Sequence, residues 1–219
     1  MTKNAASGRY DASGMEEGQW EPGSRGRVLR NLLGIGSKRE VDRKEAGELL
    51  SAQTWFVEHV GPRHRFTEED LQSMHRRWLG SIYRWAGDYR QVNLEKGGFP
   101  FAAAAQVPRL MGIFAEEVLS AHTPLSGRKD AEIIRGLAVV HTELILIHPF
   151  REGNGRLARM LAVLMALQAE LPPLDFGGIR GQRKEAYFAA VRAGIDQNYK
   201  PMESIFEKVI RRTVRKATF

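Results

Sequence analysis

Apolar residues recur at helical spacing in several stretches of the chain, and most of these stretches end at a stop signal. Between about 40 and 60, apolar and aromatic residues lie among many charges, which predicts an amphipathic helix that ends at Gly61-Pro62. The sequence Thr-Glu-Glu-Asp at 67–70 is typical of a capping box, so we expect a second helix from there to about Trp85. Pro108 suits the first turn of a third helix.

The most regular apolar pattern lies in the second half of the chain. We expect Asp130 to cap a helix that ends on His148, because Pro149 disfavours the helical conformation in the residue before it. A second apolar helix begins near Asn154 and stops before Pro172. The sequence therefore predicts two consecutive buried helices joined by a short turn.

Two further helices are predicted at 183–196 and from Pro201 to about 216. The best strand candidate is 91–101, where apolar residues alternate on both sides of Gly97-Gly98, a pair that suits a tight turn. We therefore expect a mostly α-helical fold with one β-hairpin.

Composition limits the class of protein. The 219 residues suit one domain, which we place at 28–219 after a segment at 1–27 rich in glycine, serine and charge. The chain has no cysteine, so disulfides and thiolate metal sites are excluded. No apolar run is long enough to span a bilayer, and the N-terminus lacks the apolar core of a signal peptide, so we expect a cytoplasmic protein.

The densest group of chemically active residues is 148–159, with the sequence HPFREGNGRLAR. Its glycines fall where the first N–H groups of the second helix have no helical partner, which creates an anion site. Glu152 lies four residues before Arg156, and Arg159 follows three residues later, so all three can face a common ligand. This arrangement predicts a site for a metal-bound polyphosphate.

The same run resembles, at every fixed position, the HxFx(D/E)GNGRxxR signature of Fic domains, which typically transfer AMP from ATP to a target hydroxyl. The resemblance implies the Fic fold, a helical bundle with a β-hairpin flap, and it implies ATP and Mg²⁺ as cofactors. It makes His148 the general base and Glu152 the ligand of Mg²⁺. The phosphate-binding residues that it implies are Gly153, Asn154, Gly155, Arg156 and Arg159.

Other parts of the chain also resemble Fic domains. The run from Arg84 to Arg90 is similar to the start of the flap, and 91–101 to the flap itself, on which a protein substrate would dock by strand-like main-chain pairing. Asn198 and Tyr199 resemble the segment that contributes to the adenine and ribose pocket. We therefore expect transfer of AMP to a Tyr, Ser or Thr hydroxyl of a protein.

A short N-terminal sequence resembles the (S/T)xxxE(G/N) inhibitory motif of the same family, on Ser13, Glu17 and Gly18. The implied helix, at about 12–18, would set Glu17 against Arg159 and prevent productive binding of the γ-phosphate. Some Fic proteins with such an internal glutamate also remove AMP, and the sequence leaves that activity open.

The sequence leaves other donors and other classes of protein open. The same site could use another nucleotide, or transfer phosphate or phosphocholine. The formal charge of +7 could indicate a protein associated with nucleic acid, although the basic residues at 211–216 are better explained as a solvated helix face. The chain could also be one half of a toxin and antitoxin pair, and exposed apolar residues could support a homo-oligomer.

Overall fold

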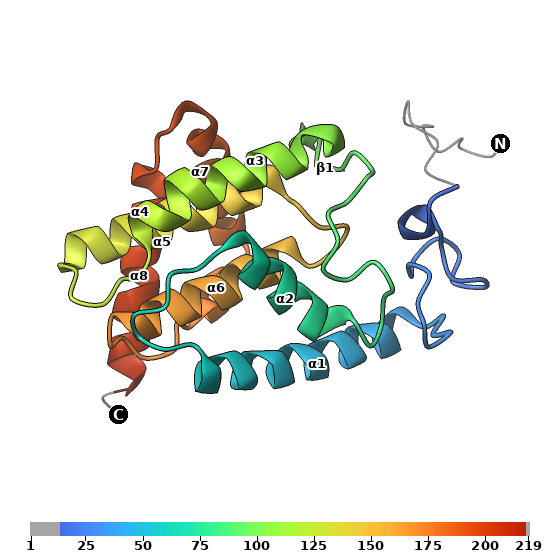
Figure 1. The fold of residues 1–219 in the computed structure, drawn as a ribbon, viewed down its shortest axis with the longest axis horizontal. Coiled ribbons are helices and arrows are strands. Elements are labelled where there is room, and N and C mark those ends of the chain that lie inside the picture. The colour runs from blue at the N-terminus through green and yellow to red at the C-terminus, as the bar shows by residue number, and fades with distance from the viewer. Residues whose placement is uncertain (1–13, 218–219) are drawn as a thin grey trace.

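The computed structural model describes residues 14–217, and these are mostly helical (Figure 1). The longer helices are α1 (Lys38–His59), α2 (Glu68–Leu79), α3 (Val107–Ile113), α5 (Asp130–Ile147), α6 (Asn154–Gln168), α7 (Gln182–Ala193) and α8 (Lys200–Ala217). The shorter ones are η1 (Glu16–Gly18), η2 (Ala104–Gln106), the π-helical η3 (Phe114–Leu119), α4 (Ser120–His122), η4 (Phe176–Gly178) and η5 (Gly194–Asp196). None of the described helices is long and apolar enough to cross a membrane.

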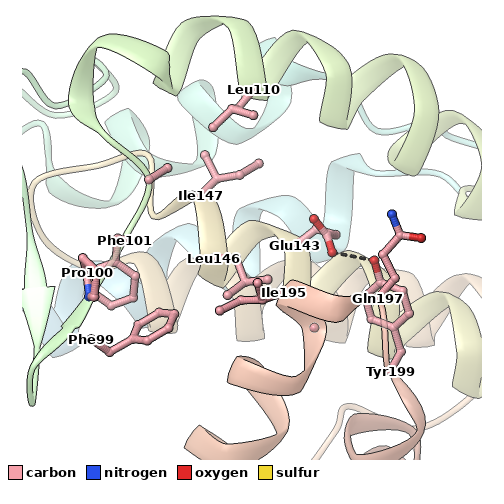
Figure 2. A pocket seen from close by; sticks show the side chains of 12 residues that line it. Phe99, Pro100, Phe101, Leu110, Glu143, Leu146, Ile147, Ile195, Gln197 and Tyr199 are labelled. Atoms are coloured by element: carbon pink, nitrogen blue, oxygen red, sulfur yellow. Dashed lines mark hydrogen bonds between the residues drawn. The ribbon is translucent and has the colours of Figure 1, made fainter.

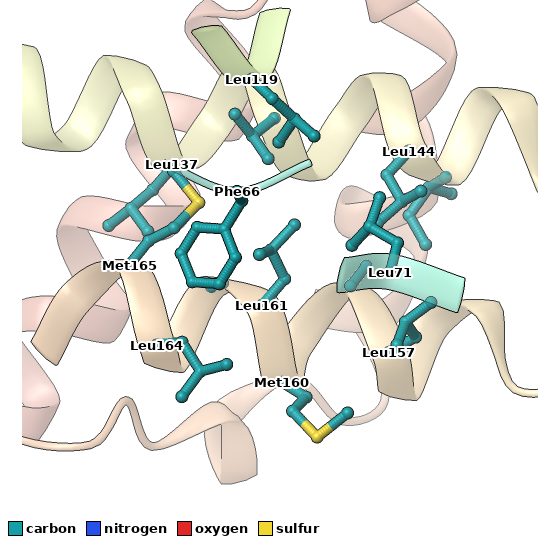
Figure 3. Close-up of a cluster of buried hydrophobic side chains, with 14 of the residues drawn as sticks. Phe66, Leu71, Leu119, Leu137, Leu144, Leu157, Met160, Leu161, Leu164 and Met165 are labelled. Carbon is teal, nitrogen blue, oxygen red and sulfur yellow. The ribbon is translucent and has the colours of Figure 1, made fainter. Parts of the chain in front are cut away.

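Helices α5 and α6 form the centre of the molecule, with α1 and α2 on one side and α3 on the other (Figure 1). Figure 3 shows their shared core, in which Leu137 of α5 and Leu161 and Met165 of α6 surround Phe66. These side chains are almost completely buried. Each contributes roughly 1.5–3 kcal/mol by leaving water, so the two predicted apolar helices supply much of the stability of the fold.

The part of the chain before α1, residues 14–37, is called the N-terminal segment from here on and packs against this bundle. Val28 and Leu29 are buried in a second cluster with Trp78 of α2. The backbone of Trp20 forms a single antiparallel bridge with Leu29, so the segment doubles back on itself before α1 begins.

The predicted hairpin is present but short. Strands β1 (Glu95–Lys96) and β2 (Phe99–Pro100) are antiparallel, and Lys96 lies opposite Phe99. Gly97 and Gly98 have φ angles of 59° and 76°, which this two-residue turn requires and glycine adopts without strain.

The helix ends follow local signals, with two corrections. Helix α2 begins with the predicted capping box between Thr67 and Asp70. It ends at Leu79 and not near Trp85, because Gly80 closes it and a series of turns follows. The expected cap at Asp130 was also wrong: Lys129 is the N-cap, since the Glu132 carboxylate accepts a hydrogen bond from the Lys129 N–H at 3.1 Å.

The capping box gives a first prediction. Thr67→Ala removes the hydroxyl that accepts from the Asp70 N–H, so the free energy of unfolding should fall by about 1 kcal/mol in urea denaturation. Thr54→Ala is the matched control, because its exposed hydroxyl lies inside α1, away from both helix ends, and donates to the Leu50 carbonyl. Equal stability of the Thr67→Ala variant and the unmodified protein would contradict the assignment of this cap.

Candidate active site

His148 lies at the junction where α5 ends. It adopts the left-handed conformation, with φ 54° and ψ 59°, and its N–H closes the helix on the Leu144 carbonyl. Its Nδ1 lies 3.1 Å from the Ile145 carbonyl oxygen, which can only accept, so Nδ1 carries the proton and Nε2 keeps a free lone pair. The ring also stacks on Phe101, with centroids 3.6 Å apart. The imidazole is therefore held in the tautomer that a general base requires.

Burial lowers the pKa of His148 from 6.5 to about 4. The hydrogen bond to Ile145 opposes this shift, and the Arg90 guanidinium adds to it. The ring is consequently uncharged at neutral pH, so Nε2 is free to accept a proton.

The turn after His148 is shaped by glycine. Gly153 has φ 84°, and a Cβ there would lie 2.6 Å from the Trp78 ring, so no larger residue fits without a shift. A Cβ on Gly155 would meet no atom within 4 Å, so open space lies beside the first turn of α6. The N–H groups of Asn154 and Gly155 make no hydrogen bond to a described residue, so they are left to bind an anion.

The Asn154 side chain has a different role from a direct phosphate contact. It is buried, its Oδ1 accepts from the Phe150 N–H at 2.9 Å, and its Nδ2 donates to the Phe150 carbonyl at 2.7 Å. The side chain therefore fixes the turn, and only the backbone of Asn154 is left to face an anion.

The two arginines of the motif differ in their surroundings. Arg156 donates to the buried Glu45 at 2.6 Å and to Glu152 at 3.3 Å, and it lies over the Trp78 ring. Arg159 makes no hydrogen bond or ion pair with any group that the structure describes, and burial lowers its pKa. Arg156 is thus held in place by the protein, whereas Arg159 is free to pair with an anion.

Glu152 is a candidate ligand for a metal ion. One carboxylate oxygen accepts from the Gly153 N–H at 3.0 Å, and the side chain is half-exposed. Among the described residues no group of three or more His, Asp or Glu gathers around a point that could hold a metal. Mg²⁺ commonly takes one or two carboxylates and completes its shell with phosphates and water, so the residues fit a Mg²⁺ that arrives with a nucleotide.

Arg90 connects the flap to His148. This side chain is only 2% exposed. Its guanidinium donates to four carbonyl oxygens, at distances of 2.5–3.2 Å, which belong to Val92, Ala102, Ile147 and His148. Two of these carbonyls lie on either side of the hairpin, and two lie at the end of α5. One buried cation therefore fixes the flap relative to the candidate base.

His75 supports the turn between His148 and α6. Its Nδ1 accepts from the Gly87 N–H at 2.8 Å, so its Nε2 carries a proton and donates to the Glu152 carbonyl at 3.0 Å. The ring is fully buried and stacks on Phe150. His141 is also buried, in contact with Tyr187, as expected for a core histidine.

A cavity of about 420 Å³ lies beside the flap, between β2, α5 and η5 (Figure 2). Tyr199 lines this cavity, and its hydroxyl donates to Glu143 at 2.6 Å. Asn198 is exposed and does not line it. Of the two residues predicted for a nucleoside pocket, Tyr199 therefore lines this cavity and Asn198 does not.

In this structure Glu17 does not contact Arg159. Ser13 lies outside the described residues, and Glu16–Gly18 forms a single 3-10 turn in place of the expected helix. The Glu17 carboxylate accepts from the Gln91 N–H at 2.6 Å, and no ion pair joins it to Arg159 within residues 14–217. The Glu17 carbonyl accepts from Arg151 at 2.8 Å, so this turn binds both the start of the flap and the turn after His148.

Four side chains that matter here had not been predicted for the site: Glu45, His75, Arg90 and Glu143. Glu45 and Arg90 looked in the sequence like ordinary charges of a helix and of the run at 84–90. Helical periodicity can place an ionisable residue on the buried face of a helix, which indicates that it has a partner. It does not indicate which distant residue that partner is.

We predict that Arg90→Met lowers the free energy of unfolding by about 3 kcal/mol, because four carbonyl groups lose a charged donor. Hydrogen exchange of the flap amides should accelerate in parallel. Arg84→Met is the control, since that guanidinium is exposed and pairs with Glu16 at the surface. If Arg90→Met has the same stability and exchange as Arg84→Met, Arg90 does not fix the flap.

A third prediction concerns the charge of His148. An NMR titration should show its imidazole remaining neutral down to about pH 4, with the resonance identified by its loss in His148→Asn. Because the folded pKa lies below the unfolded value of 6.5, the neutral ring contributes stability above pH 6.5 that is lost as the pH falls towards 4. A midpoint near 6.5 would mean that the ring is solvated.

Comparisons with known proteins agree with this geometry. Residues 65–166 match the model of the Fic/DOC family. A probable protein adenylyltransferase of Sinorhizobium fredii is 31% identical over 154 residues, which cover 68% of this chain and 73% of the relative. The probable protein adenylyltransferase Fic of Escherichia coli is 28% identical over 183 residues, or 84% of this chain and 88% of that protein.

Among solved structures, the N-terminal Fic domain of a Bartonella quintana effector with bound ADP has a TM-score of 0.68 and 26% identity. The match covers 89% of this chain and 95% of that domain. The sequence matches and the shared helical fold with its hairpin lead to one conclusion: this chain belongs to the Fic/DOC family.

Proposed function

We propose that this chain is a protein adenylyltransferase, which transfers AMP from ATP to a Tyr, Ser or Thr hydroxyl of a protein. The observation that carries the proposal is the state of His148: its ring is fixed, neutral and free at Nε2, and it lies at the turn that leads into the first turn of α6. The names of the sequence relatives and the ADP bound to the Bartonella quintana domain support the same activity.

The proposed reaction is a single displacement at the α-phosphorus. The target hydroxyl gives its proton to Nε2 of His148 while its oxygen forms a bond to the α-phosphorus. The bond from this phosphorus to the bridging oxygen breaks, and pyrophosphate leaves with the electron pair. Such a transfer depends on positioning and on charge stabilisation, which fixed donors and cations supply.

Three groups of this chain would bind the phosphates. The N–H groups of Asn154 and Gly155, which make no hydrogen bond to a described residue, suit the oxygens of a phosphate chain. The free guanidinium of Arg159 suits its terminal phosphate. Glu152 would hold Mg²⁺, which neutralises charge on the phosphate oxygens when bound.

The nucleoside would occupy the cavity of about 420 Å³ beside the flap. Its walls are mainly apolar, including Phe99 and Leu146, and they carry a few polar groups such as Gln197 and Tyr199. This composition suits a base and a sugar, for which apolar area gives affinity and single polar groups give orientation.

The protein substrate would dock along the flap at about 91–101, by main-chain pairing with the short hairpin. Such pairing places few demands on the sequence of the target. Exposed Leu50 and Val57 on α1 would support a homo-oligomer, and use of ATP as donor would suit a cytoplasmic location.

The reaction can be tested by intact-mass spectrometry after incubation with ATP and Mg²⁺, because enzymes of this type often modify themselves when they are freed from inhibition. We predict an adduct of AMP mass, which His148→Ala abolishes while fold and ATP binding remain. His59→Ala, at the exposed end of α1, should keep the adduct. An adduct that persists in His148→Ala would refute the base, and a phosphate-sized adduct would refute the donor chemistry.

The same measurement tests whether the N-terminal segment is inhibitory. We propose that the turn at Glu16–Gly18 restrains the site through its bonds to Gln91 and Arg151. Glu17→Gly should then increase the adduct. If it does not, the open Arg159 favours the alternative in which a separate inhibitor protein covers this arginine.

A further inference from the structure

A second cavity, of about 240 Å³, lies between the N-terminal segment, the start of α1 and the turn after His148. Buried Val41 and Tyr83 contribute to its apolar walls. Its charged lining residues are the cations Arg27, Lys38, Arg151 and Arg156, and the carboxylates Glu45 and Glu152. Four positive and two negative groups line the cavity, and one of the cations, Lys38, also pairs with Asp42 outside it, so the lining is net positive and is complementary to a compact anion.

Arg151 is the most informative of these residues. It is partly buried, and Nε is its one hydrogen-bonding nitrogen, with the Glu17 carbonyl as acceptor, among residues 14–217. Its two terminal nitrogens therefore have no protein acceptor within that part of the chain. A partly desolvated guanidinium with free donors beside a cavity favours an oxyanion that accepts two parallel hydrogen bonds.

The other cations are only partly satisfied by the protein. Arg27 donates through Nε to the Ser24 carbonyl at 3.2 Å and keeps its terminal nitrogens for other partners. Lys38 pairs with Asp42 one turn along α1, at an exposed position where such a pair contributes little. Neither residue belongs to the motif at 148–159, so the cationic lining comes from separate parts of the chain.

We infer that this cavity binds a pyrophosphate-class anion, with Arg151 as its central ligand. Glu152 lines the cavity and also belongs to the proposed phosphate site, and Arg156, which pairs with Glu152, lines the cavity beside it, so the two sites share a wall. The leaving pyrophosphate could pass from one to the other along these residues. The inference that the anion is the leaving pyrophosphate rests on the proposed adenylyl transfer. The inference that the cavity binds such an anion does not rest on it.

The binding can be measured without turnover. Isothermal titration calorimetry with sodium pyrophosphate compares the full chain with Arg151→Met, Lys38→Ala and Arg39→Ala. The last is a matched control, because Arg39 is exposed beside Lys38 and does not line the cavity. We predict that Kd rises about tenfold in Arg151→Met and about threefold in Lys38→Ala, and stays the same in Arg39→Ala.

Equal affinity in all four proteins, or no binding to the unmodified chain at millimolar pyrophosphate, would overturn the inference. Circular dichroism checks that Arg151→Met is folded. If it is not folded, the inference is tested by comparing the pyrophosphate Kd of Lys38→Ala with that of Arg39→Ala. Arg151-dependent binding without any AMP adduct would keep the cavity and refute the adenylyl transfer. An AMP adduct together with pyrophosphate binding that does not depend on Arg151 would support the adenylyl transfer and refute the anion site in this cavity.

Product inhibition identifies the source of the anion. If the cavity takes the leaving group, added pyrophosphate should inhibit transfer, and Arg151→Met should need about tenfold more of it for the same inhibition. If pyrophosphate binds through Arg151 but leaves the transfer rate unchanged, the anion is a free phosphate compound and the leaving-group assignment is wrong.

Discussion

The hydrogen bonds from the Arg90 guanidinium to the carbonyls of Val92, Ala102, Ile147 and His148 are the interaction on which the site depends. The end of a helix leaves carbonyl groups without helical partners, and a short hairpin leaves more of them beside it. Each buried carbonyl without a donor costs roughly 1–3 kcal/mol. One planar cation satisfies both sets, and in doing so it brings Phe101 of the flap onto the ring of His148.

These hydrogen bonds place the positive charge of Arg90 close to His148, the candidate base. Arg90 disfavours protonation of His148, and burial disfavours it more strongly, so the two effects keep the ring neutral together. Cations crowd the following turn as well, where Arg151, Arg156 and Arg159 fall within nine residues. Glu45 and Glu152 balance Arg156, but Arg159 has no anionic partner in the described chain. An anionic ligand would therefore stabilise this turn as well as bind to it.

The sequence was sufficient for features that neighbouring residues determine. Pro149 marks the end of α5, Gly97-Gly98 the hairpin turn, and Thr67 the start of α2, and each acts through its own backbone or its nearest turn. It was insufficient for pairings between distant residues. The bond from Arg156 to Glu45 spans 111 positions, and spacing along a helix carries no information about such a partner. The bond from the Gln91 N–H to the Glu17 carboxylate is another such pairing, since a short motif does not determine which surface its carboxylate meets.

The N-terminal segment joins these distant pairings into one unit. Glu17 binds the start of the flap at Gln91 and the turn after His148 at Arg151, while Leu32 donates to the Ile82 carbonyl near the end of α2. Trp20 and Leu29 of the same segment line the cavity of about 240 Å³. A ligand in that cavity therefore touches the segment and the turn at once. Anything that displaces the segment must weaken such a ligand, and by linkage a bound ligand must hold the segment against the turn by the same free energy.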